Sequence, residues 1–171
     1  MKKEKSIELL NKAVAGELLA VHQYMYFHFH CDDQGYDLLA NLFRRTAIDE
    51  MMHIEKLSER ILFLKGDVEM IPAGGVKKIK DVKSMLEKAA EMETETVHDY
   101  NHWANECSQN EDSVTKKLFE DLVAEEEVHF DRYDLEMDNL TNFGDNYLAL
   151  QSIERSKSVH AASGGGGTAA T

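Results

Sequence analysis

The chain has 171 residues and a formal net charge of −13, so we expect one domain with a substantial core. The acidic balance argues against nucleic acid as a partner, because phosphate binding requires a basic surface. No stretch reaches the ~20 apolar residues of a membrane span, and the first residues lack the apolar segment of a signal peptide, so we expect a cytoplasmic protein with no membrane contact.

Helical periodicity dominates the first half of the chain. Apolar residues recur at steps of three and four over residues 6–32 and again over 37–65, which predicts two long helices separated by a turn. We expect Ser6 to be the N-cap of the first helix and Gly66 to be the C-cap of the second.

The second half repeats this pattern. Two further helices are predicted over residues 81–108 and 113–142, and Gly144 restarts a short fifth helix that runs to about residue 155. We take residues 1–155 as the folded domain. The remaining stretch, 156–171, is small, polar and glycine-rich, and we expect a flexible tail there.

The connection between the second and third helices is the longest. A helix of about 28 residues is ~42 Å long, and the fourteen residues 67–80 reach at most ~46–50 Å when extended. This segment can therefore just cross the full length of the bundle. The third helix would then run parallel to the second. We expect an all-α four-helix bundle made of two hairpins joined by a long crossover.

The most informative pattern is a pair of Glu-x-x-His sequences, each with another helical glutamate 33 residues before its own glutamate. Each glutamate lies on the apolar stripe of its helix, and burying four carboxylates without compensation would cost several kcal/mol apiece. Two divalent cations would balance the four negative charges. The alternative is a set of hydrogen-bonded polar residues or a water-filled core. The predicted ligands are Glu17, Glu50 and His53 in the first half, and Glu93, Glu126 and His129 in the second.

The spacing also predicts what each ligand does. The two glutamates that stand three residues before a histidine should bridge the metals, because glutamate and histidine then share one helix face. The other two glutamates should be terminal ligands, and each histidine should bind one metal. Mixed oxygen and imidazole ligation suits iron or manganese, and zinc could occupy the site without reacting.

Around these residues the chain resembles the bacterioferritins. That resemblance implies a ferritin-like four-helix bundle with a short fifth helix, assembled as a 24-subunit hollow shell. It also implies ferroxidase activity: a di-iron centre oxidises Fe(II) with O2 or H2O2, the ferric mineral is stored inside, and a ferredoxin serves iron release. The matching blocks are residues 17–24, 48–53, 59–66, 125–129 and 144–149.

The same resemblance implies further site residues. Bacterioferritins bind haem or a related porphyrin between two subunits through a methionine directly after the second-helix glutamate, which is Met51 here; soft interface packing by Met51 and Met52 is the alternative. Tyr24 matches a tyrosine near the di-iron centre that could donate an electron, with core packing as its alternative. The additional inner-surface iron site of some members is doubtful, because Arg45 and Asp49 stand at its positions.

Two cysteines are too few for a disulfide framework or a zinc ribbon. Cys31 and Cys107 should lie at opposite ends of the bundle, ~40 Å apart, so we expect no bond between them. Two other functions remain open. A peroxidase-like di-metal enzyme without storage would usually need a four-cysteine iron module, and the other is a shell that only carries haem or metal.

Overall fold

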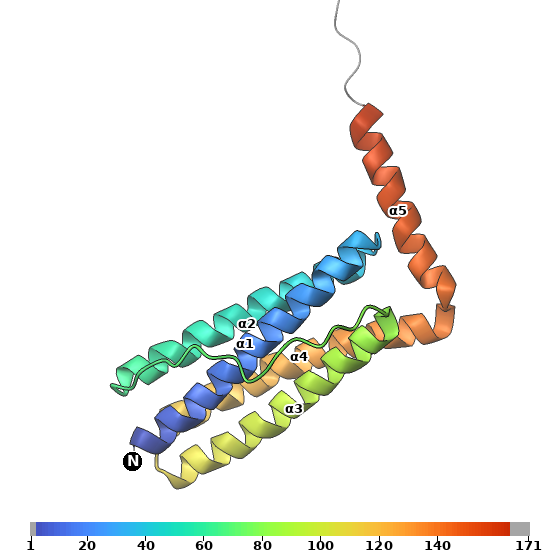
Figure 1. Ribbon diagram of the computed structural model, residues 1–171. Coiled ribbons are helices and arrows are strands. Elements are labelled where there is room, and N and C mark those ends of the chain that lie inside the picture. The colour runs from blue at the N-terminus through green and yellow to red at the C-terminus, as the bar shows by residue number, and fades with distance from the viewer. Residues whose placement is uncertain (1–2, 165–171) are drawn as a thin grey trace, which may run out of the picture.

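The chain forms a bundle of four long helices, and a fifth helix lies at one end of the bundle (Figure 1). The computed structural model describes residues 3–164, with side chains up to Ser158. None of the described helices is both long and apolar enough to cross a membrane. The helices are α1 (Lys3–Asp33), α2 (Asp37–Phe63), α3 (Val82–Gln109), α4 (Ser113–Phe143) and α5 (Asp145–Gly164).

The predicted connectivity is confirmed. Helices α1 and α2 form one antiparallel hairpin and α3 and α4 form another, while the crossover runs along the bundle so that α3 starts parallel to α2 (Figure 1). The crossover is fixed to α1 by hydrogen bonds. The amide of Ala73 donates to the carbonyl of Ala15 over 2.8 Å, and the Gln23 side chain bonds both the carbonyl and the amide of Lys77 at 3.0 and 2.7 Å.

Ser6 is not the N-cap that the sequence suggested, because it lies inside α1. Its hydroxyl donates instead to the buried carboxylate of Asp112 over 2.7 Å. A partner 106 positions away in the chain has therefore taken the side chain that local capping rules assign to the helix end.

The end of α2 also differs from expectation, because Lys65 and not Gly66 has the left-handed backbone, with φ 69°. The amides of Lys65 and Gly66 donate to the carbonyls of Leu62 and Ile61, both at 3.0 Å, which is a Schellman end. Gly66 serves close packing. A Cβ atom at that position would lie 2.8 Å from Ile7.

Helix α5 is longer than predicted: it ends at Gly164, so residues 156–164, which we expected to belong to a flexible tail, are helical. No helix breaker occurs between Arg155 and Gly164, and the alanines there favour a helix. Residues 165–171 lie outside the described part. Near its start α5 packs Tyr147 and Leu148 against the bundle.

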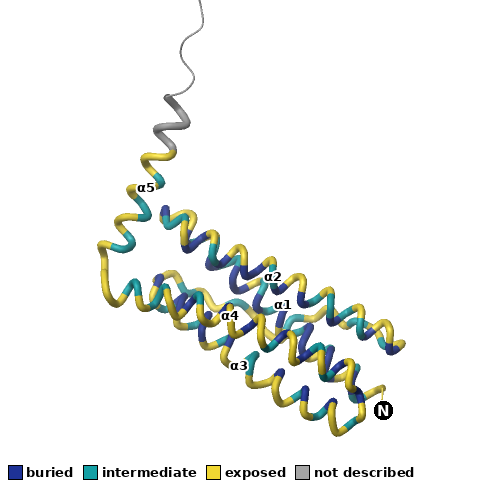
Figure 2. Tube along the Cα trace, turned by 180° about the vertical axis from the view of Figure 1, so that it is seen from behind, coloured by how far each residue is buried: buried dark blue, intermediate teal, exposed yellow. Residues whose placement is uncertain are grey.

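The core is divided into two apolar halves. One surrounds Tyr24 and Phe43, and the other surrounds Leu57 and Phe119. Buried residues follow the inner face of every bundle helix in Figure 2. Both cysteines are buried and unbonded, one in each half, as predicted. Between the halves lies a layer of buried charged side chains.

Candidate metal centre

The charged layer consists of the six residues that the sequence singled out. Each of the four bundle helices contributes from near its middle, where the apolar stripe of the helix faces inward. All six side chains are almost fully buried. Their exposed fractions are 2% for Glu17, 1% for Glu50, 0% for His53, 2% for Glu93, 0% for Glu126 and 3% for His129.

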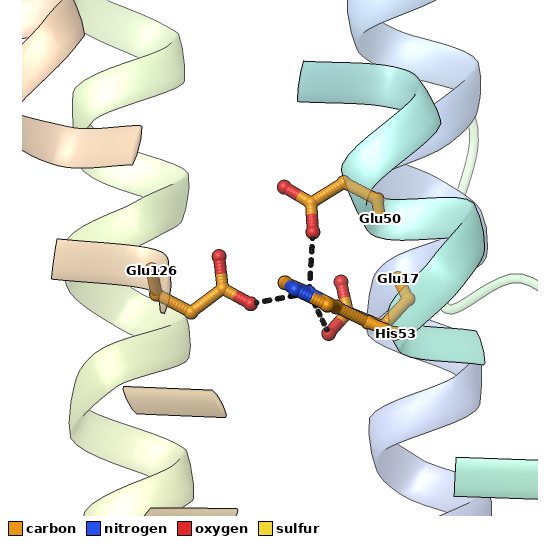
Figure 3. Close-up of side chains that lie close together, drawn as sticks. All are labelled: Glu17, Glu50, His53 and Glu126. Atoms are coloured by element: carbon orange, nitrogen blue, oxygen red, sulfur yellow. Dashed lines mark ion pairs between the residues drawn. The ribbon is translucent and has the colours of Figure 1, made fainter. Parts of the chain in front are cut away.

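The six residues form two groups that share two carboxylates. The first contains Glu17 and His53, the second contains Glu93 and His129, and both contain Glu50 and Glu126. Within each group the ligand atoms lie within 4.8 Å of one another. Figure 3 shows the first group converging from three helices. This is the arrangement required if Glu50 and Glu126 bridge two metal ions that each have one terminal carboxylate and one imidazole.

The histidines direct the same ring atom, Nδ1, into the centre. His53 Nδ1 lies 2.8 Å from Glu50 Oε2, 3.0 Å from Glu126 Oε1 and 3.4 Å from Glu17 Oε1. His129 Nδ1 lies 3.2 Å from Glu50 Oε1 and 3.1 Å from Glu126 Oε2. Each ring nitrogen can direct at most one hydrogen toward these oxygens.

Several polar atoms of the centre are buried without a hydrogen bond of normal geometry. They include both carboxylate oxygens of Glu50, one of Glu126 and Nδ1 of His53. Native proteins rarely leave buried polar atoms in this state unless an ion or water satisfies them. Carboxylate oxygens and imidazole nitrogens are suitable ligands for iron, so the residues present fit a pair of divalent cations.

The proton affinities of these groups are strongly shifted. Burial, followed by the negative charges of Glu50 and Glu126, raises the pKa of Glu17 and of Glu93 well above the usual range. Burial opposes charge on His129, but its hydrogen bonds with carboxylates outweigh that effect and raise its pKa to about 10. The metal-free centre thus holds protons that bound cations would have to displace.

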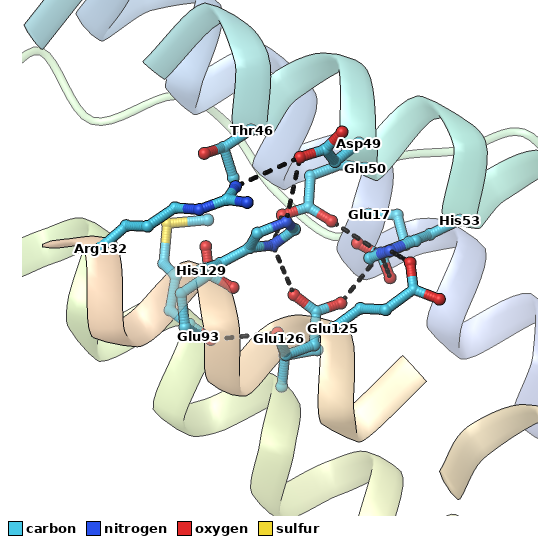
Figure 4. A network of polar contacts seen from close by, with 12 residues as sticks. Glu17, Thr46, Asp49, Glu50, His53, Glu93, Glu125, Glu126, His129 and Arg132 are labelled. Atoms are coloured by element: carbon cyan, nitrogen blue, oxygen red, sulfur yellow. Dashed lines mark hydrogen bonds and ion pairs between the residues drawn. The ribbon is translucent and has the colours of Figure 1, made fainter. Parts of the chain in front are cut away.

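A second layer orients the histidines from outside (Figure 4). His53 Nε2 lies 3.0 Å from Glu125, whose carboxylate also accepts a bond from Lys56 at 2.6 Å. In the other hairpin His129 Nε2 lies 3.4 Å from Asp49, which Arg132 approaches at 3.5 Å. Carboxylates in this position fix the orientation of a metal-binding imidazole and increase its basicity.

The chain is similar to known proteins over most of its length. The family model of the ferritin-like domain matches residues 7–143. The bacterioferritin of Desulfovibrio desulfuricans is 40% identical over 148 residues, which cover 86% of this chain and 83% of that protein. The bacterioferritin of Brucella melitensis is 36% identical over 141 residues, covering 82% and 88% of the two chains. The chain belongs to the bacterioferritin family.

A solved structure supports this assignment. An X-ray structure of the Desulfovibrio desulfuricans bacterioferritin, which describes its di-iron site in different catalytic states, superposes with a TM-score of 0.86 at 39% identity. The match covers 88% of each chain. Sequence and structure therefore both show that most of this chain has the ferritin-like fold with a fifth helix.

Other residues predicted from the family resemblance lie in two different places. Tyr24 is buried beside the centre, and its hydroxyl donates to Glu93 Oε1 over 2.5 Å. Met51 lies outside the centre on α2 and is 52% exposed. Asp49 contacts His129 and Arg132.

Sequence reasoning missed Tyr100 and Glu125 as parts of the site. A signal was present, because corresponding residues of the two hairpins are 76 positions apart. Tyr24 follows Glu17 by seven residues, and Tyr100 follows Glu93 by the same interval. Likewise Glu125 corresponds to Asp49. Extending the repeat beyond the six ligands would have found both residues.

We expect the metal-free protein to lose stability as pH rises. The pKa of His129 is raised from 6.5 to about 10, and those of Glu17 and Glu93 are also raised, so the folded protein keeps protons that the unfolded chain releases. The free energy of unfolding should fall by on the order of a few kcal/mol between pH 6.5 and 10. Urea unfolding of chelator-treated protein measures this change. A free energy of unfolding that rises over that interval would contradict the raised pKa values of these groups.

Proposed function

We propose that the protein oxidises Fe(II) and stores the ferric product. The observation that carries this proposal is the pair of buried ligand groups that share Glu50 and Glu126. The name and described di-iron site of the Desulfovibrio desulfuricans relative support the choice of iron. Iron is both the substrate and the stored cargo in this scheme.

The ligand geometry allows two Fe(II) ions to bind side by side. Glu17 and His53 would hold one ion, Glu93 and His129 the other, and the shared glutamates would lie between them. The two Fe(II) ions give up one electron each, and these two electrons reduce O2 with two protons to H2O2, or reduce H2O2 with two protons to two molecules of water. Protons displaced from the ligands on metal binding are available for this reduction.

Removing a terminal ligand tests this function. Two Fe(II) per chain are added without oxygen, oxygen is admitted, and ferric absorbance is followed. We expect a fast phase that saturates near two irons per chain, and a rate at least about 100-fold lower in Glu93→Ala, because one iron loses its terminal carboxylate. Glu95→Ala, which removes an exposed glutamate from the same helix, is the matched control. An unchanged Glu93→Ala rate would refute the proposal.

We infer that the storage form is a shell of 24 chains in the cytoplasm, with a ferredoxin as the reductant for iron release. Exposed apolar side chains that subunit contacts would cover support assembly: Phe63 is 70% exposed, Ile71 66% and Leu150 60%. Sedimentation analysis should give the mass of 24 chains. A stable monomer or dimer that forms no mineral would favour a di-metal redox enzyme without storage.

We also propose that a haem or related porphyrin binds between two chains through Met51 of each. The half-exposed position of this thioether on the outside of α2 supports the proposal, because a partner chain could reach it. Met51→Leu should abolish the bis-methionine absorption spectrum of porphyrin-loaded protein. Met52→Leu, which changes the neighbouring half-exposed methionine, should preserve it.

A further inference from the structure

Two tyrosines bind the terminal carboxylates of the centre in a crosswise manner. The Tyr24 hydroxyl, from α1, donates to Glu93 on α3. The Tyr100 hydroxyl, from α3, donates to Glu17 on α1. Both side chains are buried, with exposed fractions of 0% and 2%. At each of the two candidate metal positions, one phenol is therefore hydrogen-bonded to the terminal carboxylate.

The hydrogen bond to a carboxylate gives each phenol the proton acceptor that a tyrosine requires to act as an electron donor. Oxidation of a buried tyrosine removes an electron and also the hydroxyl proton, so a hydrogen-bonded base must be present to accept that proton. Glu17 fills this role for Tyr100. The Tyr100 hydroxyl is one carboxylate away from the iron position, which makes the path for the electron short.

The third buried tyrosine among the described residues does not share this arrangement. Tyr133 is fully buried and its ring lies 5.6 Å from that of Tyr24, but its hydroxyl forms no hydrogen bond with any carboxylate of the centre. The Tyr100 ring is held by Trp103 and Phe119, with ring centroids at 5.6 and 5.3 Å. Burial alone therefore does not explain the paired hydroxyl contacts of Tyr24 and Tyr100.

We propose that Tyr100 is an electron donor of the centre, together with Tyr24, for which the family resemblance implies the same role. The proposal rests on the ferroxidase function proposed above. Two Fe(II) supply two electrons and the two tyrosines supply two more, so O2 is reduced fully to water. In the balanced reaction, two Fe(II), two tyrosines, O2 and two protons give two Fe(III), two neutral tyrosyl radicals and two molecules of water. No peroxide leaves the protein in a single turnover.

The test combines radical counting with peroxide measurement after one turnover with two Fe(II) per chain. Without Tyr100 the centre holds only three of the four electrons that reduce O2 to water, so turnover should end at H2O2 with both electrons drawn from iron. In Tyr100→Phe, H2O2 should therefore appear in solution, and freeze-quench electron paramagnetic resonance should show no more than half the wild-type tyrosyl signal. Tyr24→Phe should show the same two changes, and any residual radical in it then belongs to Tyr100. Tyr133→Phe is the matched control, because it removes a buried hydroxyl that forms no hydrogen bond with a ligand of the centre. This variant should resemble the wild type.

The outcomes separate this proposal from the proposed function. Failure of the wild type to oxidise two irons in a fast phase would overturn the ferroxidase itself. A fast phase in the wild type, together with no radical in Tyr24→Phe and wild-type radical and peroxide yields in Tyr100→Phe, would overturn the second donor. Tyr100 would then only position Glu17. Anaerobic Co(II) titration of Tyr100→Phe checks that the variant folds and still binds about two metal ions per chain.

Discussion

Glu126→Ala is expected to abolish fast iron oxidation, with a rate constant at least about 100-fold below that of the wild type. Glu126 belongs to both ligand groups, so its removal takes one ligand from each iron. Loss of Glu17 should be milder for metal binding, because Glu17 belongs to one group only. Stopped-flow absorbance measures the rate. Co(II) titration should show two weakened sites in Glu126→Ala and one in Glu17→Ala.

The adjacent residue provides the control for this experiment. Glu127 is exposed on the same helix, and Glu127→Ala removes the same charge without touching the centre. Its oxidation rate should equal that of the wild type. A Glu126→Ala protein that still oxidises two irons per chain in the fast phase would show that this carboxylate does not bridge the metals.

Asp112→Ala should destabilise the fold by about 3–5 kcal/mol, because it breaks a buried ion pair and leaves its partner uncompensated. Asp112 is 2% exposed and forms an ion pair with Arg60 at 2.7 Å. The Arg60 side chain is itself only 11% exposed. The same carboxylate accepts hydrogen bonds from the hydroxyls of Ser6 and Thr115, both at 2.7 Å. One side chain thus joins α1, α2 and the start of α4.

Chemical denaturation of metal-free protein measures this loss. Asp81→Ala is the comparison, because Asp81 caps α3 through the Ser84 amide at 2.9 Å but is exposed and has no buried ion pair. Its replacement should cost only about 1 kcal/mol. Equal losses in the two variants would show that the Arg60 pair contributes nothing beyond an ordinary helix cap.

The sequence predicted the bundle and the six central residues because each depends on local periodicity. Glu17, Glu50 and their equivalents lie on apolar stripes, and a stripe determines which side chains point inward. The crossover followed from helix and chain lengths. These features need no knowledge of which distant residues meet, so a single chain was sufficient to predict them.

The features that were missed depend on distant contacts. Ser6 donates to Asp112, which lies between the two helices of the other hairpin. Gly66 is needed because Ile7 packs too closely to leave room for a Cβ atom. The Tyr100 contact with Glu17 also crosses between hairpins, although the repeat of 76 positions marks Tyr100 as the equivalent of Tyr24. Capping rules describe one helix at a time and cannot anticipate a competing partner from another. Composition predicts a tail from residue 156, but α5 continues to Gly164 because no helix breaker comes before that residue.

The constant offset of 76 positions has a consequence for the origin of this fold. Glutamate, tyrosine, cysteine, acidic residue, histidine and basic residue recur in the same order in both hairpins, although the surrounding residues have diverged. Such a repeat is the pattern that a tandem duplication of one hairpin would leave. An unduplicated hairpin would carry half of the metal centre and could complete it by pairing with a second copy of itself. With the crossover, that twofold arrangement lies inside a single chain, so the outer surfaces of the two halves need not be alike.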